Sequence, residues 1–281
     1  MKTNHNIYLN QAFEIAKINL GKTKSNPSVG CVVVKNNSVI SSACTALNGR
    51  PHAEFNALSK SNKFFGSDMY VTMEPCTHKG KTPPCTNIIL KKGIRRIFYS
   101  FNDLDERTSQ KLKKTLSNTR VKIFKRNTKL YSNFYQSYFY NIKKKLPYID
   151  GKIAISKDFY TINKYSKWIT SKQSRIRAHL IRSEYDSILS TSKTINMDNS
   201  LLNCRLNGFN KNKPDLVIID IKLRIKKNLK LYGLKKRKVF IVTSVKKSSK
   251  INYLKKKGVK FIKIKSLENK KDFLNLFKIL K

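Results

Sequence analysis

One histidine and two cysteines constrain this chain more than any other feature of its sequence. His52 stands in the triplet His52-Ala53-Glu54, and Cys76 and Cys85, each preceded by proline, follow with eight residues between them. One imidazole and two thiolates leave the fourth position of a tetrahedral zinc ion to water, as in catalytic zinc sites. Either element alone is weak evidence, but together and in this order they predict a catalytic zinc site with His52, Cys76 and Cys85 as ligands.

Glu54 has the position of a general acid–base residue in such a site. Zinc lowers the pKa of its water ligand to about 7 and so provides hydroxide at neutral pH. Glu54, two residues from His52, can take the proton of this water and pass it to a leaving amine. Pro83 and Pro84 predict that Cys85 lies in the first turn of a helix, whose dipole favours the thiolate. The sequence therefore predicts a hydrolytic deaminase acting on a nitrogen heterocycle, with Glu54 as its catalytic residue.

The other cysteines and histidines are expected to have different roles. Cys31 lies in an apolar run and is expected, like Cys44, in the core. His5 and His179 show no pattern that indicates a site. His78 follows Cys76 by two residues, and the sequence alone does not decide whether it contacts a substrate.

The chain has no sequence feature of export or membrane insertion. Its five cysteines are an odd number, and the N-terminus has no continuous apolar stretch of a secretory signal. No run approaches the length of about 18 apolar residues that a membrane span needs. We therefore expect a soluble cytoplasmic protein with reduced thiols.

The net charge of +44 in 281 residues is extreme. Such a charge suggests a polyanionic partner when it is concentrated on one patch. Here lysine is spread through every segment, which favours a lysine-rich composition with solvated charges. A phosphate-bearing or polyanionic partner is the alternative.

The spacing of apolar residues predicts alternating helices and strands in the first half of the chain. We expect helices over residues 9–20, from about 52, and over 84–92, and strands over 30–34, 39–44, 69–73 and 96–101. The first two strands would form a hairpin that turns on Asn36-Asn37. After Asp103 we expect a polar helix-like stretch. This alternation predicts an α/β domain with helices on both faces of its sheet, over residues 1–145.

A second α/β domain is predicted over residues 146–281. It would have strands at 148–155, 187–190, 216–220 and 239–243, and helices at 171–184, 248–257 and 270–280, the first capped by Thr170. Because the last helix runs into the end of the sequence, this domain is expected to be incomplete at its C-terminus.

Several motifs resemble the bifunctional riboflavin-biosynthesis deaminase/reductase family, within the cytidine-deaminase-like superfamily. They are Asn26-Pro27, His52-Ala53-Glu54 with Ala57-Leu58, and the uninterrupted segment from Glu74-Pro75-Cys76 to Pro83-Pro84-Cys85. Nucleic-acid deaminases have two residues between their cysteines, so the longer spacer favours this family. The resemblance implies a three-layer α/β/α deaminase domain followed by a dihydrofolate-reductase-like domain.

The second half resembles the first part of the family's reductase domain. The matching segments include Ser166-Lys167-Trp168-Ile169-Thr170-Ser171, Asp186-Ser187-Ile188-Leu189 and Leu202 with Arg205. The resemblance implies NADPH contacts by Ala154, Trp168, Thr194 and Asp198. It implies contacts with the ribose phosphate of the substrate by Ser166, Arg182, Leu202 and Arg205. Without the resemblance, the two arginines would be read as solvated surface.

The chain also departs from the family pattern. Thr45 stands where the family usually has a histidine, and Asp103-Leu104-Asp105-Glu106 replaces Asp-Pro-Asn-Pro. In the second half, Lys157-Asp158-Phe159, Asp198-Asn199-Ser200 and Ile221 replace family residues. The family continues beyond the position of Lys281 with a strand, a glycine-rich turn over the cofactor phosphates and a substrate-binding glutamate. We therefore expect an incomplete reductase half.

The resemblance implies a role in riboflavin biosynthesis. The expected reaction is zinc-dependent deamination of 2,5-diamino-6-(5-phosphoribosylamino)pyrimidin-4(3H)-one, with NADPH-dependent reduction of the ribose of the product as a second activity. The expected partner is this small phosphorylated pyrimidine, and a homodimer or a separate protein that completes the reductase is a further expectation. The alternatives are a nucleic-acid or nucleotide deaminase with a basic RNA-binding C-terminal half, and a zinc-stabilised scaffold without activity.

Overall fold

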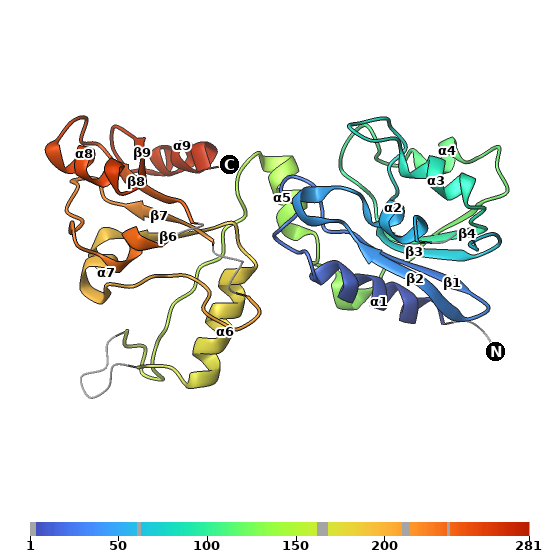
Figure 1. The fold of residues 1–281 in the computed structure, drawn as a ribbon, viewed down its shortest axis with the longest axis horizontal. Helices are drawn as coiled ribbons and strands as arrows, with labels where there is room; N and C mark the ends of the chain where they lie inside the picture. Colours follow the sequence, from blue (N-terminus) through green and yellow to red (C-terminus); the bar gives the residue numbers. More distant parts are fainter. Residues whose placement is uncertain (1–3, 61–62, 162–167, 210–213, 235–236, 281) are drawn as a thin grey trace. The chain divides into compact units, whose positions relative to one another are not determined.

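The chain forms two compact units in the computed structural model, Met1–Tyr148 and Ile149–Lys281. The structure describes residues 4–60, 63–161, 168–209, 214–234 and 237–280 (Figure 1). No helix in this part of the chain is long and apolar enough to cross a membrane.

Unit 1 is built on a five-stranded sheet in the order β2-β1-β3-β4-β5. Its strands are β1 (Gly30–Lys35), β2 (Ser38–Cys44), β3 (Asp68–Met73), β4 (Arg96–Phe101) and β5 (Lys122–Lys125). Its helices are α1 (His5–Lys17), α2 (Ala53–Leu58), α3 (Cys85–Lys91), α4 (Leu112–Thr115) and α5 (Gln136–Lys144), with short 3-10 turns η1 (Leu47–Gly49) and η2 (Lys129–Tyr131). The predicted helices and strands of residues 9–101 are confirmed, with ends that differ by a few residues.

The hairpin β1–β2 turns where the sequence predicts. Asn36 and Asn37 have φ values of 50° and 61°, which is the pair of left-handed residues that a type I′ turn requires and that asparagine tolerates. The turn matches the twist of the two strands and fixes their register. The register shifts by one residue between Val33 and Val34, so that Cys31 is opposite Ala43, and Cys31 faces the core.

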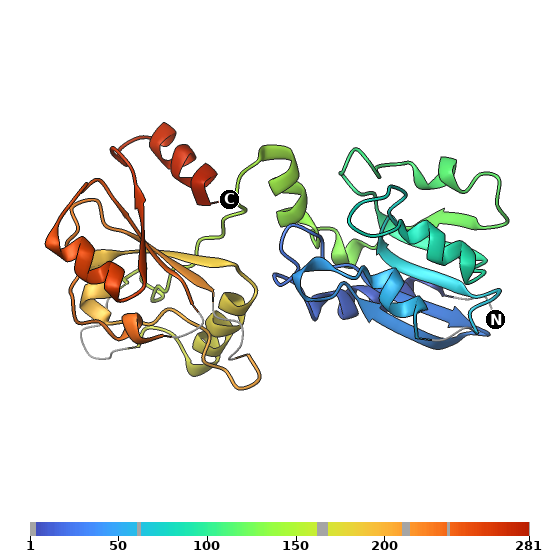
Figure 2. The same cartoon turned by 45° about the horizontal axis from the view of Figure 1, so that its top comes forward.

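Helices cover both faces of this sheet (Figure 2). Helix α1 packs with Leu9 and Ala12 against Val32, Tyr70 and Phe98 on one face. The same helix approaches β1 so closely that a Cβ on Gly30 would lie 1.8 Å from the carbonyl oxygen of Ala12. Helices α2 and α3 cover the other face, where the larger core lies. The arrangement is the predicted three-layer α/β/α.

The region after β4 differs from the prediction of a polar helix-like stretch. It contains the short helix α4 and then β5, which extends the sheet parallel to β4. Strand β5 has three exposed residues out of four, so its sequence carries little of the apolar signal that identifies a strand.

Unit 2 contains a four-stranded parallel sheet in the order β6-β7-β8-β9. The strands are β6 (Ser187–Thr191), β7 (Asp215–Ile219), β8 (Val239–Thr243) and β9 (Val259–Lys263), and the helices are α6 (Lys172–Ser183), α7 (Ser192–Asp198), α8 (Ser249–Lys256) and α9 (Lys270–Leu280), with the 3-10 turn η3 (Lys230–Gly233). Helices α7 and α8 pack on one face and α9 on the other. Strand β9 and helix α7 were not predicted.

Two predictions for this unit are wrong. Residues 148–155 form no strand, and Ile149, Ile153 and Ile155 are 57%, 69% and 38% exposed. Their period-2 pattern is that of a strand, but a strand exists only when a neighbour accepts its backbone hydrogen bonds. The N-cap of α6 is Ser171, whose side chain accepts from the N–H of Ser174, and not Thr170.

Candidate metal centre

The predicted metal ligands come from two helix starts and one strand end. His52 is the N-cap residue of α2, Cys76 follows β3, and Cys85 is the first residue of α3 with Pro84 as its N-cap. Strands β3 and β4 are parallel, so the loops that follow Met73 and Phe101 leave the same edge of the sheet. The site therefore lies at the carboxyl end of β3, where the N-termini of α2 and α3 also lie.

The ligand atoms of His52, Cys76 and Cys85 all lie within 4.8 Å of one another. The Nδ1 atom of His52 is 3.6 Å from Sγ of Cys76 and 3.5 Å from Sγ of Cys85. A tetrahedral zinc ion with Zn–S of about 2.3 Å and Zn–N of about 2.0 Å would separate nitrogen and sulfur by about 3.5 Å. The spacing and the donor set therefore fit zinc, with Nδ1 as the imidazole ligand.

Glu54 lies in the first turn of α2, and its side chain is buried. Burial raises the pKa of its carboxyl group to about 7, while the neighbouring His52 lowers it. A group with this pKa can both accept and donate a proton near neutral pH. Its environment is therefore suited to proton transfer.

The two thiols of the site differ in their protonation. Hydrogen bonds from Cys85 and His52 lower the pKa of Cys76 to about 4, and the backbone N–H of Cys85 also donates to its sulfur at 3.3 Å. The hydrogen bond to Cys76 and burial raise the pKa of Cys85. Two adjacent thiolates repel each other, so one proton remains on the pair until a cation balances the charge.

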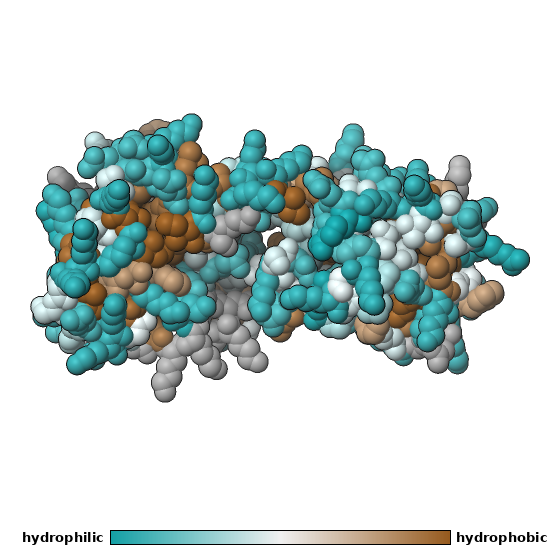
Figure 3. Space-filling model, turned by 90° about the horizontal axis from the view of Figure 1, so that it is seen from above, coloured by the Kyte–Doolittle hydropathy of each residue, from teal (hydrophilic) through white to brown (hydrophobic). Residues whose placement is uncertain are grey.

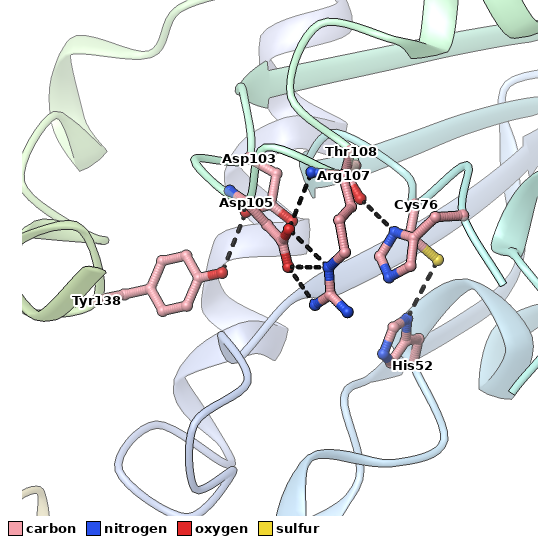
Figure 4. Close-up of polar contacts among 8 residues, drawn as sticks. His52, Cys76, Asp103, Asp105, Arg107, Thr108 and Tyr138 are labelled. Carbon is pink, nitrogen blue, oxygen red and sulfur yellow. Dashed lines mark hydrogen bonds and ion pairs between the residues drawn. The ribbon is translucent and has the colours of Figure 1, made fainter. Parts of the chain in front are cut away.

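A group of polar residues surrounds the site (Figure 4). The Thr108 hydroxyl and Nδ1 of His78 are 2.8 Å apart. Arg107 forks onto the carboxylate of Asp105. The hydroxyl of Tyr138 donates to Asp103 at 3.1 Å, and burial raises the pKa of Asp103. His78 is thus held beside the predicted metal ligands.

Three functional neighbours were not predicted from the sequence. The carboxylate of Glu74 is buried and accepts the N–H groups of Gln110 and Leu112 at 3.0 and 3.1 Å, which fixes the loop after β4. Thr108 holds His78, and Arg50 donates to Thr82 in the spacer between the cysteines. Each acts on a residue distant in the chain, so no local pattern reveals it.

Thr45, which stands where the family usually has histidine, has a structural role. It is buried, and its hydroxyl accepts the N–H of Val29 at 2.9 Å. Asn26 of the Asn-Pro motif donates to the carbonyl of Gly49 at 2.8 Å. Both residues fix the loops next to His52.

In unit 2, the residues with a predicted role toward NADPH lie on separate segments. Ala154 and Trp168 are in irregular chain, and the guanidinium of Arg175 lies 4.4 Å from the centre of the Trp168 ring. The N–H of Thr194 donates to the cap residue Thr191, and Asp198 ends α7 with an exposed side chain. Ala154 and Trp168 precede α6, whereas Thr194 and Asp198 lie in α7, directly after β6.

The residues with a predicted role toward the ribose phosphate gather at one loop, except Ser166, which is outside the described residues. Arg182 and Arg205 both donate to Asn203, at 3.4 and 3.1 Å. The carbonyl of Leu202, one residue earlier, accepts from Arg237 at 2.9 Å. Burial and the charge of Arg205 lower the pKa of Arg182, so the two cations stand close together.

Two family models match the chain and cover its two units. The model of the cytidine and deoxycytidylate deaminase zinc-binding region matches residues 2–101, and the model of the RibD C-terminal domain matches residues 147–281. Together with the His/Cys/Cys geometry, these matches define a zinc-binding deaminase joined to a reductase-type domain. They confirm the predicted fold class.

Two relatives and one solved structure are similar to this chain over nearly its whole length. The riboflavin biosynthesis protein RibD of Aquifex aeolicus is 34% identical over 98% of this chain and 76% of its own length, and that of Actinobacillus pleuropneumoniae is 30% identical over 97% and 73%. The solved structure of a diaminohydroxyphosphoribosylaminopyrimidine deaminase/5-amino-6-(5-phosphoribosylamino)uracil reductase from Thermotoga maritima superposes with a TM-score of 0.84 at 27% identity, covering 98% of this chain and 78% of that one. The chain belongs to the RibD family of riboflavin biosynthesis proteins.

Proposed function

We propose that this chain removes the pyrimidine amino group of 2,5-diamino-6-(5-phosphoribosylamino)pyrimidin-4(3H)-one and releases ammonia. The observation that carries the proposal is the convergence of Nδ1 of His52 with the sulfurs of Cys76 and Cys85 in a chain of the RibD family. The name of the Thermotoga maritima neighbour, a deaminase of a phosphoribosylaminopyrimidine, supports this substrate. The matched deaminase region supports residues 1–145 as the deaminase domain.

In this proposal different side chains of the site bind the metal and transfer the proton. His52, Cys76 and Cys85 hold the zinc ion, which when bound supplies Lewis-acid activation of water at neutral pH. Glu54 removes a proton from the attacking water and delivers it to the amino nitrogen, which then leaves as ammonia. Burial excludes water from the Glu54 carboxyl group and raises its pKa to about 7, close to neutral pH.

We further propose that residues 146–281 form the reductase-type domain and that its sheet accepts an additional β-strand that these residues do not supply. Three sheet edges are protected. Strand β9 has lysines at both of its exposed positions, Lys260 and Lys263, and β5 has Lys122 and Lys125 at two of its three exposed positions. In β2 the carbonyls of Ser42 and Cys44 accept from Lys60 and Asn56. Strand β6 has no charged residue, its Leu189 is 44% exposed, and among the described residues only β7 pairs with it. An unprotected edge of this kind is a site for strand addition.

The residues with proposed roles in reduction are those named above. Ala154, Trp168, Thr194 and Asp198 would contact NADPH, and Ser166, Arg182, Leu202 and Arg205 the ribose phosphate. The match to the RibD C-terminal domain supports an NADPH-dependent reductase of this type. The adjacent Arg182 and Arg205 are suited to a phosphate because guanidinium groups bind it through two donors.

The test is to incubate the purified chain with the diaminopyrimidine substrate, with and without NADPH, and to identify the products by mass spectrometry. We expect deaminated, unreduced product under both conditions. Addition of the part of the Aquifex aeolicus protein beyond the matched region should yield reduced product only with NADPH. No deamination with zinc bound would refute the proposed reaction, and reduction by the chain alone, or through a homodimer, would refute the need for an additional strand.

A further inference from the structure

Arg50 lies over the spacer that connects the two cysteines of the metal centre. Its Nη1 donates to the hydroxyl of Thr82 at 2.6 Å. A Cβ built on Gly80 would lie 3.6 Å from Nη2 of Arg50 and 3.5 Å from Nε2 of His78. The absence of a side chain at Gly80 therefore leaves a space that is bordered by the guanidinium of Arg50 and a ring nitrogen of His78.

His78 is oriented toward this space by a second contact. Nδ1 of His78 lies 2.8 Å from the hydroxyl of Thr108, a fully buried residue. Since one ring nitrogen is held in this way, the other, Nε2, points to Gly80 and Arg50. Two independent contacts, with Thr82 and with Thr108, thus hold the guanidinium of Arg50 and the ring of His78 in place before any ligand binds.

The charge of Arg50 is not balanced nearby. Among the residues that the structure describes, no carboxylate lies within ion-pair distance of it. Arg107, also close to the site, is neutralised by its forked contact with Asp105, and Arg96 by Asp68. Arg50 is therefore the arginine at this site whose charge remains available to an anion.

We propose that Arg50 binds the phosphate group of the substrate and so makes the deaminase selective for a phosphorylated pyrimidine. The inference rests on the proposed deaminase function and extends it to a residue that neither the metal centre nor the reductase half includes. Nη1 is occupied by Thr82, so Nη2 and Nε donate to two phosphate oxygens in the fork that guanidinium presents to oxyanions. Lys79 and Lys81, which are exposed on the same spacer, add charge without a fixed position.

The experiment compares the native chain with Arg50→Gln and Arg50→Lys on two substrates, the phosphorylated diaminopyrimidine and its phosphatase-treated form. For Arg50→Gln we expect the KM of the phosphorylated substrate to rise roughly 10- to 100-fold, the loss expected for a charged hydrogen bond, with kcat unchanged. The KM of the dephosphorylated substrate should stay the same. Arg50→Lys should restore part of the difference. The matched control is Arg126→Gln, on the far side of the sheet beside Phe98.

A structural role of Arg50 predicts different results. If the contact with Thr82 only held the spacer, Arg50→Gln would affect both substrates equally, and Thr82→Val, which removes the tether but keeps the guanidinium, would have the same effect. An unchanged ratio of the two KM values in Arg50→Gln would overturn the proposal. Zinc content and thermal unfolding of each variant show whether the fold is intact.

A binding measurement separates this inference from the proposed function. Ribose 5-phosphate, titrated into the zinc-loaded native chain by calorimetry, should bind, and Arg50→Gln should weaken that binding by the same factor as the KM. Both titrations are repeated with Arg182→Gln and Arg205→Gln present together, which removes the two proposed phosphate-binding cations of unit 2. Equal binding to the native chain and to Arg50→Gln refutes the phosphate site even if deamination is observed. Binding lost in Arg50→Gln supports it even if the pyrimidine proves to be the wrong substrate.

Discussion

At the scale of single residues, the start of one short helix brings together a proposed metal ligand, His52, and the proposed proton carrier, Glu54. His52 and Glu54 are two residues apart on α2, so the helix backbone alone fixes one relative to the other. Cys76 and Cys85 reach them from the end of β3 and the start of α3. The proposed proton carrier can therefore be changed without removing a proposed metal ligand.

Replacing Glu54 with glutamine should abolish turnover and leave zinc bound. Glutamine has nearly the same shape but can neither accept nor deliver the proton, a loss of about 10²–10⁴-fold in kcat. Turnover of the pyrimidine and zinc content by elemental analysis measure the two effects. Glu184→Gln, an exposed site at the end of α6, is the control, and unchanged activity of Glu54→Gln would show that Glu54 does not carry the proton.

His5 should make the stability of unit 1 depend on pH. Its ring stacks on Phe98 at 4.2 Å and its Nδ1 lies 2.8 Å from the hydroxyl of Tyr70. Burial, with Arg126 and Arg96 nearby, lowers its pKa below the ordinary 6.5. Because the unfolded chain then binds the proton more tightly, this contribution is present above the unfolded pKa and is lost as the pH falls through about 6.5 toward the folded value. Denaturant unfolding at several pH values should show a smaller decline for His5→Gln than for the native chain, and equal slopes would contradict the assignment.

At the scale of elements, the close approach of α1 to β1 is the tightest contact of unit 1. Gly30 is fully buried in β1 and leaves room for the carbonyl of Ala12. Gly30→Ala should therefore push the helix off the sheet and lower the free energy of unfolding by about 3 kcal/mol or more, the upper range for overpacking. Gly151→Ala, where a Cβ would meet nothing within 4 Å, is the matched control. Equal denaturant midpoints for the two variants would show that α1 moves without cost.

The elements that were predicted correctly are those whose signal is contained in their own residues. Strands β4 and β8 have the predicted ends because apolar residues form a continuous run between polar ones. The segment 148–155 has an equally clear pattern but forms no strand, because no strand among the described residues pairs with it. The sequence predicts His52, Cys76 and Cys85 as one site because the motif and its spacing are contained in the sequence itself. It does not reveal Glu74, Thr108 or Arg50, whose contacts form only in the folded chain.

At the scale of the whole molecule, the net charge of +44 means that basic residues far outnumber acidic ones. Figure 3 shows hydrophilic side chains spread over both units on the face in view, around hydrophobic areas. A dispersed charge of one sign destabilises the folded chain by repulsion, and salt screens it. Added NaCl should therefore raise the thermal unfolding midpoint of the native chain, and a midpoint that falls with salt would show that specific ion pairs dominate instead.

The same charge separates a small-molecule deaminase from a nucleic-acid deaminase. A protein that neutralises 6–10 phosphates of a polyanion loses about 10³–10⁵-fold in affinity between 50 and 200 mM salt. One phosphate on a pyrimidine substrate should give a change of only a few-fold over that range, because a single cation such as Arg50 contacts it. Steady-state deamination of the phosphorylated pyrimidine and of a single-stranded oligonucleotide, each followed at both salt concentrations, measures the difference. We expect a shallow dependence for the pyrimidine and no deamination of the oligonucleotide, since the RibD family and the nine-residue step from Cys76 to Cys85 both indicate a small-molecule pyrimidine as substrate. Deamination of the oligonucleotide that disappears steeply with salt would reassign the lysines of both units to nucleic-acid binding.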